Sequence, residues 1–187
     1  ISPYTDAEAA EALSKLAEYP LLAKVSQQFF PEESPDFLKN ILKRIKTIDE
    51  FQVLVMQKVV RWVLDNTAKN FSYDGVANID PNKKFLALSN HRDINLDPAI
   101  TQLVLYNNGF PMTEIAVGDN LITNKTIEYL IRSNRMIKVV RGITARELYL
   151  SSQLLSRYIR LNITEQRSSI WLAQRQGRTK NGYDITE

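Results

Sequence analysis

Hydrophobic and polar residues along the first seventy positions repeat at helical spacing. One apolar stripe occupies residues 7–17, a second follows Ser34-Pro35-Asp36, and a third runs over residues 49–68. Proline is favoured in the first turn of a helix, so the second stripe is expected to begin a helix there. The pattern predicts an N-terminal helical region over residues 1–70, with its apolar stripes in the core.

The pattern changes after residue 70 to short apolar runs that alternate with helical stripes. Consecutive strands separated by helices need crossover connections, which are typical of parallel sheets. The predicted class is therefore α/β, a mainly parallel sheet with flanking helices over residues 71–187. Ligands bind such sheets at the carboxyl ends of the strands, so the loops after Ser89, Val140 and Ala173 are the places to look. The expected strands are 85–89, 113–117, 136–140 and 169–173, and the expected helices are 96–106, 125–132 and 144–162.

Composition narrows the chemistry. The 187 residues include no cysteine and one histidine, which excludes disulfides, thiolate metal sites, cysteine nucleophiles and a metal site of several histidines. We expect no metal site and no bound cofactor. No apolar run is long enough to predict a transmembrane span. The chain begins Ile-Ser-Pro without an initiator methionine or a signal pattern, so we expect a piece of a longer protein.

The net charge of +3 is unevenly distributed. From Lys125 onward the chain has twelve basic and five acidic residues, a net of +7, and nine of the twelve are arginines. This asymmetry has two interpretations: solvated helix faces, or a surface for the phosphates of a ligand, an anionic lipid or a nucleic acid. The nucleic-acid interpretation lacks a recognisable binding motif, and the aromatic residues are not interleaved with the basic ones.

The only histidine lies where the first predicted strand ends. His91 follows Asn90 and precedes two aspartates, Asp93 and Asp97. A histidine there can be a general base if a carboxylate orients its other ring nitrogen and stabilises the imidazolium. The alternative is structural, with one aspartate as the N-cap of the next helix.

The sequence Ser89-Asn90-His91-Arg92 followed by Asp97 resembles the first motif of the glycerolipid acyltransferase superfamily, which includes the glycerol-phosphate and lysophosphatidate acyltransferases. That motif is a histidine and an aspartate separated by four residues, and here five residues separate His91 from Asp97. Either the loop has one extra residue or Asp93 has the orienting role. Asp97 is the favoured partner because the chain after it continues as the family's helix does.

Three later segments are similar to further motifs of this family, in the same order. Gly118-Asp119-Asn120-Leu121 resembles a Gly-x-Asn-Leu block, and the strand that ends at Arg141 resembles the second motif, whose arginine binds substrate. The third motif is usually Pro-Glu-Gly-x-Arg. Here Gln176 replaces its glutamate and Arg175 its proline, and one residue between glycine and arginine is missing. The family's fourth motif has no counterpart before the chain ends. The substrate-binding residues that the resemblance implies are Asn90, Arg92, Gly118, Asn120, Arg141, Gln176, Gly177, Arg178 and Lys180.

The resemblance implies an O-acyltransferase of phospholipid biosynthesis. Its donor would be acyl-CoA or acyl carrier protein, and its acceptor glycerol phosphate or a lysophospholipid. It also implies a cytoplasmic enzyme peripherally associated with the inner face of an anionic membrane. For Phe29-Phe30 and Trp62 we expect core packing, with lipid contact as the alternative. A lipid-binding scaffold without activity is the second hypothesis, and a nucleic-acid-binding module is the third.

Overall fold

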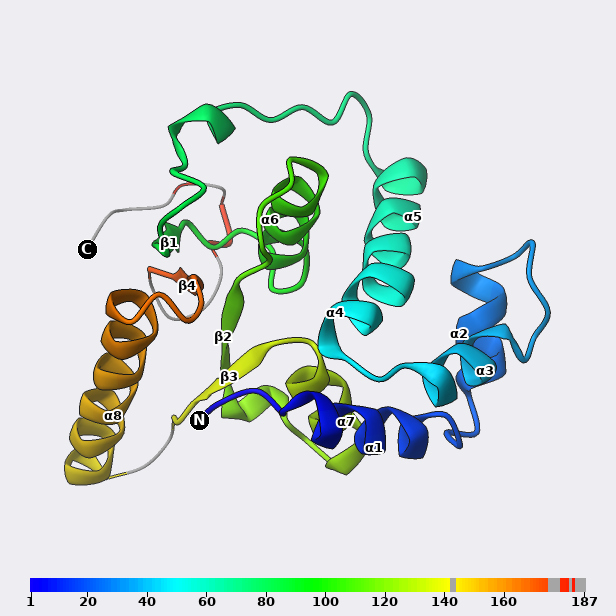
Figure 1. Ribbon diagram of the computed structural model, residues 1–187, viewed down its shortest axis with the longest axis horizontal. Coiled ribbons are helices and arrows are strands. Elements are labelled where there is room, and N and C mark those ends of the chain that lie inside the picture. The colour runs from blue at the N-terminus through cyan, green and yellow to red at the C-terminus, as the bar shows by residue number, and fades with distance from the viewer. Residues whose placement is uncertain (142–143, 175–178, 182, 184–187) are drawn as a thin grey trace. The chain divides into compact units, whose positions relative to one another are not determined.

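The computed structural model describes residues 1–141, 144–174, 179–181 and 183, and it is an α/β protein with N-terminal helices (Figure 1). The chain forms two compact units. The helical unit comprises Ser2–Phe71 and Asn120–Met136, and the α/β unit comprises Ile1, Ser72–Asp119 and Ile137–Glu187. Residues 120–136 thus group with the N-terminal helices, although they lie within the range that the sequence assigns to the α/β domain.

The helical unit is built around one apolar cluster. Leu13, Leu42 and Phe51 are almost completely buried in it. The first helix begins at a capping box in which the Thr5 hydroxyl and the Glu8 carboxylate each accept the other residue's backbone N–H. The helices of this unit are α1 (Asp6–Leu16), α2 (Leu22–Phe29), α3 (Phe37–Arg44), α4 (Ile48–Phe51), α5 (Gln57–Thr67) and α7 (Lys125–Ser133).

The helix expected over residues 49–68 is interrupted. A π-helical segment, Gln52–Met56, separates α4 from α5. Gln52 is 1% exposed and is bonded at both ends of its amide, because its Nε2 donates to Asn134 Oδ1 at 3.2 Å and its Oε1 accepts from Arg135 Nε at 2.8 Å. The buried amide needs both partners.

Phe29, Phe30 and Trp62 pack within the helical unit. The rings of Phe29 and Trp62 meet edge to face with their centroids 5.1 Å apart, and Phe30 is buried. The expectation of core packing is confirmed, so lipid contact has to be sought elsewhere on the molecule.

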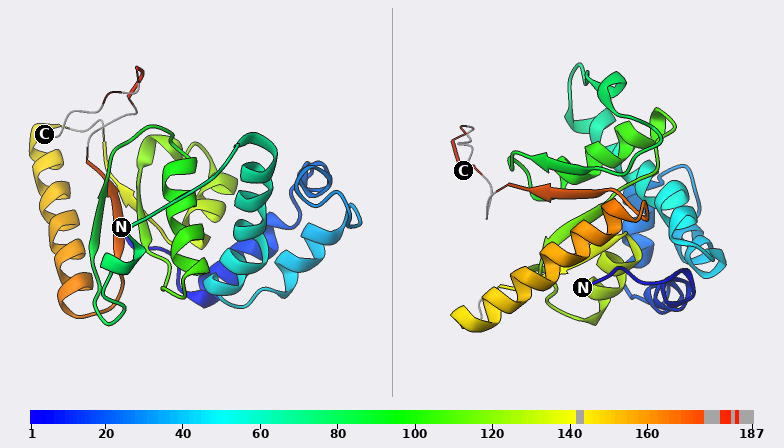
Figure 2. Two further views of the ribbon diagram at one scale, coloured as in Figure 1. Left: turned by 90° about the horizontal axis from the view of Figure 1, so that it is seen from above. Right: turned by 60° about the vertical axis from the view of Figure 1, so that its left-hand side comes forward.

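The α/β unit contains a four-stranded parallel sheet. Its strands lie in the order β1 (Leu86–Ser89), β4 (Ile170–Ala173), β2 (Glu114–Gly118), β3 (Met136–Val139). The register pairs Leu86 with Ile170 and Ser89 with Ala173. Helices α6 (Leu96–Asn107) and α8 (Ala145–Thr164) lie on opposite faces of the sheet (Figure 2). Every expected strand and helix of this region is present, with boundaries within two residues.

Gly109 ends α6 as the Asn-Asn-Gly sequence predicts. Its φ of +76° is in the left-handed region, which glycine adopts without strain. Within the described part of the chain, no helix combines the length and the apolar character needed to cross a bilayer.

A buried polar cluster fixes α8 to the sheet. Glu114 is 8% exposed, and its two carboxylate oxygens accept hydrogen bonds from Tyr158 Oη at 2.7 Å and Ser168 Oγ at 2.9 Å. Burial and the bond to the carboxylate raise the pKa of Tyr158 well above its usual value. The phenol therefore keeps its proton and remains a donor to Glu114 well into the alkaline range.

We expect Tyr158→Phe to lower the free energy of unfolding by about 1–3 kcal/mol, because a buried carboxylate oxygen loses its donor. Tyr149→Phe on the same helix is the matched control: Tyr149 is 63% exposed, so its loss should change stability by less than about 0.5 kcal/mol. Urea unfolding at neutral pH measures both. Because the raised pKa favours the folded state below the phenol's ordinary pKa, the difference should shrink in strongly alkaline solution. Equal effects of the two variants would contradict the role of the cluster.

Candidate active site

His91 and Asp97 form a hydrogen-bonded pair at the carboxyl end of β1. The Nδ1 of His91 lies 3.1 Å from Oδ2 of Asp97. The histidine is two residues past the strand, and Asp97 is in the first turn of α6, so the six-residue connection folds back to bring them together. Their side chains are 13% and 19% exposed, which makes the pair accessible but mostly shielded from water.

The same carboxylate oxygen organises the loop that carries the histidine. Asp97 Oδ2 also accepts the backbone N–H groups of Arg92 at 2.7 Å and Asp93 at 2.9 Å. A carboxylate that receives two N–H groups is an acceptor, and it can pair with His91 only if Nδ1 carries the hydrogen. The neutral imidazole then has its basic lone pair on Nε2, which is the arrangement a general base needs.

Asp93 has a different place in this loop. Its Oδ1 accepts the backbone N–H groups of Asn95 and Leu96, each at 2.8 Å, and so forms the turn that begins α6. The sequence left open which aspartate pairs with His91 and which caps the helix. In the structure Asp97 contacts the histidine, and Asp93 caps the turn. The five-residue separation is accommodated by the turn at Asp93.

The segment after β4 lies against the His91 loop. Gln174 donates its backbone N–H to Ser89 O at 3.0 Å and its Nε2 to Asn90 Oδ1 at 2.6 Å. Thr179 N donates to His91 O at 2.8 Å. Gln174, directly after β4, therefore contacts Asn90, and Thr179 contacts the backbone of His91. Gln176, Gly177 and Arg178 lie outside the described residues, and Lys180 is exposed.

The ends of β2 and β3 meet through a residue that the sequence analysis did not select. Asp119 Oδ1 accepts the backbone N–H of Arg141 at 3.0 Å. Asp119 directly follows the buried Gly118, and the only indication in the sequence was its place as the unspecified residue of the Gly-x-Asn-Leu block, two residues after the predicted strand. Within the described residues the half-buried Arg141 guanidinium has no ion-pair partner.

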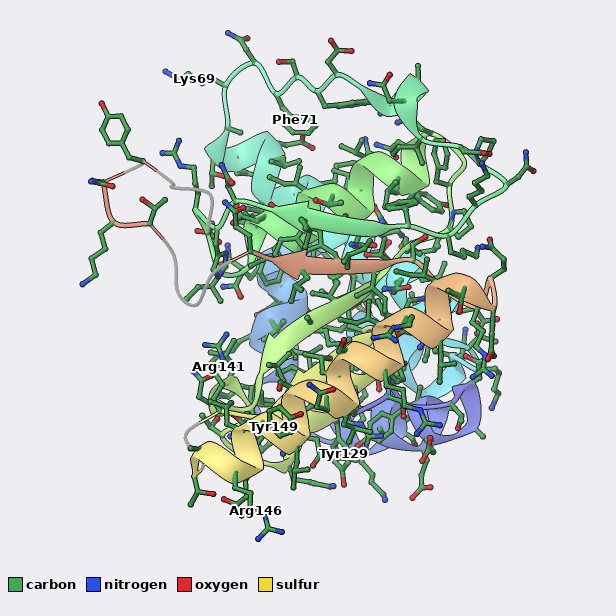
Figure 3. The ribbon with its side chains drawn as sticks, turned by 90° about the vertical axis from the view of Figure 1, so that its left-hand side faces the viewer. Lys69, Phe71, Tyr129, Arg141, Arg146 and Tyr149 are labelled. Carbon is green, nitrogen blue, oxygen red and sulfur yellow. The ribbon has the colours of Figure 1, made fainter. Side chains whose placement is uncertain are left out.

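The sheet order separates the histidine from this arginine. β1 and β3 are the two edge strands, three interstrand spacings or roughly 14 Å apart. His91 and Arg141 both follow carboxyl ends of strands, and Figure 3 shows Arg141 at the sheet end where β4 stops. A ligand that touched both would have to extend along this end of the sheet, across the ends of β4 and β2. Of the other predicted residues, Asn90, Arg92 and Asn120 are exposed.

A hollow of about 340 Å³ lies between β1 and α8. Leu86 is on the strand side, and the helix side is formed mostly by apolar and small residues. The lining residues are Leu86, Ser152, Leu155, Ser156, Ile159 and Arg160. Leu88, on the same face of β1 as Leu86, is 63% exposed. The strand that leads to His91 thus exposes apolar side chains along that face.

Metal ligands do not gather at this end of the sheet: the described residues contain no group of three or more histidine or acidic side chains placed to hold an ion.

No protein-family model matches the chain, and no curated protein matches it in sequence. The function is therefore inferred from the geometry of the site and from the motifs themselves.

Proposed function

We propose that this chain is an O-acyltransferase that moves an acyl group from acyl-CoA or acyl carrier protein to a hydroxyl of glycerol phosphate or a lysophospholipid. The observation that carries the proposal is the contact between His91 Nδ1 and Asp97 Oδ2 at the carboxyl end of a parallel strand. The motifs support it by their order along the chain.

The proposed reaction is a direct transfer. The Nε2 of His91 takes the proton of the acceptor hydroxyl as its oxygen attacks the thioester carbonyl carbon. The new C–O bond forms, the C–S bond breaks, and the departing thiolate takes up a proton from the imidazolium. Asp97 holds the imidazole in the required tautomer and stabilises its charged form. No cysteine is needed because no acyl-enzyme forms.

Phosphate binding is assigned to the basic side chains near the same end of the sheet. Arg141 offers a guanidinium, and two of its five N–H donors can bond two phosphate oxygens together. Arg178 and Lys180 are the further candidates from the third motif. Asn90, Arg92, Gly118, Asn120, Gln176 and Gly177 are proposed to contact substrate, with backbone N–H groups near Gly177 as the oxyanion donors.

The acyl chain is assigned to the hollow between β1 and α8. Its apolar residues, Leu86, Leu155 and Ile159, would remove hydrocarbon from water. The face of β1 on which Leu86 lies continues past the exposed Leu88 toward His91. A thioester at the histidine would therefore have an apolar surface for its chain along the same strand.

The direct test is transfer by the purified chain. Palmitoyl-CoA or palmitoyl-acyl carrier protein is incubated with glycerol 3-phosphate or a lysophosphatidate, and the acylated product is detected by mass spectrometry. Release of free thiol that depends on the acceptor is expected. A wild-type protein that binds these lipids but transfers nothing to any acceptor would instead support the scaffold hypothesis, for which the glutamine at position 176 is the sequence argument. DNA or RNA binding with a steep salt dependence would favour the third hypothesis.

Asp119 is proposed as a positioning residue for Arg141. Asp119→Ala should raise the KM for the phosphate-bearing acceptor by about tenfold and leave kcat nearly unchanged, because it removes a bond that holds the arginine's backbone and not a group that reacts. Asp119→Asn keeps an acceptor oxygen and should restore most of the affinity. Steady-state kinetics with varied acceptor measures both. A fall in kcat with unchanged KM, or failure of the asparagine variant to rescue, would contradict the assignment.

Association with an anionic membrane surface on the cytoplasmic side belongs to the same proposal, because both the acceptor and the product are amphiphiles.

A further inference from the structure

Helix α8 exposes several large apolar side chains. Leu148, Tyr149, Leu150 and Leu154 are 49%, 63%, 56% and 56% exposed. In its second half the Tyr158 hydroxyl donates to Glu114 of β2 and Asn162 is buried, whereas residues 145–150 in its first half are exposed.

Four residues of α8 form one line along the helix. Arg146, Leu150, Leu154 and Arg157 are separated by four, four and three positions, which is the spacing of one helical face. We call this line the α8 face: two exposed leucines bounded at each end by an exposed arginine. Figure 3 shows α8 toward the viewer with Arg146 and Tyr149 labelled.

The positive charge of the α8 face is not neutralised within the described part of the chain. Arg146 and Arg157 form no ion pair there. The helix has one acidic residue, Glu147, and its carboxylate accepts the Thr144 hydroxyl at 2.7 Å and the Thr144 backbone N–H at 3.2 Å. These bonds lower the pKa of Glu147 and tie its charge to the helix cap.

We propose that the α8 face docks onto the surface of an anionic lipid bilayer. Leucines can enter the boundary between headgroups and acyl chains, while arginines at each end extend along the apolar surface to reach lipid phosphates. The matching charge favours anionic lipid over a neutral apolar partner, and the exposed leucines favour lipid over nucleic acid, which is recognised mainly by charged and aromatic side chains. This inference rests on the proposed function, because it identifies the surface by which the proposed acyltransferase would contact the membrane.

The experiment is flotation of the purified chain with vesicles. One set contains equal parts of phosphatidylcholine and phosphatidylglycerol, and the other contains phosphatidylcholine alone. Binding to the anionic vesicles, reduced by added salt, is expected. Arg146→Gln with Arg157→Gln should weaken the partition coefficient about twenty- to thirty-fold, because each basic residue at such a surface contributes about a fivefold factor. Leu150→Ser with Leu154→Ser should weaken it at least about tenfold.

Matched controls remove the same groups elsewhere. Lys24→Gln with Lys69→Gln removes two exposed charges, and Leu21→Ser removes a leucine that is 49% exposed; both should bind as wild type does. Leu150→Phe with Leu154→Phe keeps the apolar area and should retain binding. Equal binding to both vesicle sets, wild-type binding by the arginine or serine variants, or equal losses in the controls would overturn the proposal.

Activity toward soluble substrates separates this inference from the proposed function. Transfer from acyl-CoA to glycerol 3-phosphate without vesicles should be unchanged in the arginine and serine variants. Vesicle binding without any transfer would support membrane docking by the α8 face and contradict the acyltransferase proposal. Transfer without vesicle binding would support the acyltransferase proposal and contradict docking by the α8 face.

Discussion

Replacing His91 with alanine is expected to lower acyl transfer by roughly 10²–10⁴-fold, the range in which a positioned general base contributes. His91 is the chain's only histidine, so no other imidazole can take its place. The loss should appear in kcat with little change in the KM for either substrate, because the imidazole acts on the proton and not on the phosphate or the acyl chain. Thiol release from acyl-CoA, followed continuously, measures the rate.

The fold of this variant is the necessary control. The loop keeps the backbone bonds from Arg92 and Asp93 to Asp97, so circular dichroism and urea unfolding should change little. Imidazole added to the assay should restore part of the rate, since the side chain is 13% exposed and its removal leaves room beside Asp97. A variant that is as active as wild type would eliminate the dyad mechanism.

Asp97→Asn is expected to reduce transfer by about 10²–10⁴-fold while leaving the protein folded. An asparagine oxygen can still accept the two backbone N–H groups, so the loop keeps its shape. It lacks the negative charge that stabilises the imidazolium, and its amide group can hold the ring in the wrong tautomer. Initial rates over varied acceptor concentration measure the loss.

Asp93→Asn is the matched substitution four residues earlier. Asparagine forms the same kind of turn and caps helices as well as aspartate, so the rate should stay within about twofold of wild type. Comparable losses in both variants would assign the effect to the shape of the loop. A loss confined to Asp93→Asn would reverse the roles given to the two carboxylates.

The elements of the α/β unit could be predicted because their patterns are local. Strand β4 is a short apolar run between polar segments. Helix α6 is followed by a glycine, Gly109, which adopts the positive φ typical of a helix end. Both signals can be read from the sequence. The π segment could not be predicted in this way, because Gln52 is buried by partners at Asn134 and Arg135, more than eighty residues away. Helix α2 lacks a side-chain cap, and no helix was specifically predicted for it.

The site was predictable in its residues more than in its contacts. The strand pattern indicated where His91 would lie, and the motif offered two aspartates, of which Asp97 was favoured. The link from Asp119 to the Arg141 backbone joins two strand ends twenty-two residues apart, and it follows from sheet order, which the sequence does not determine. The exposure of Leu150 and Leu154 could not be predicted either, because an apolar stripe has the same sequence pattern whether it packs against a sheet or is exposed to solvent.

The turn at Asp93 has a consequence for how such loops change length during evolution. Compared with the motif that it resembles, this loop has one more residue between His91 and Asp97, and Ile94 at the turn is 45% exposed. Insertions are tolerated where side chains project into solvent and the flanking bonds survive. What such a loop has to preserve is then the contact between its histidine and its aspartate, and the number of residues between them can vary. Search patterns written around paired anchors with a variable gap would therefore recover chains that patterns with a constant gap pass over.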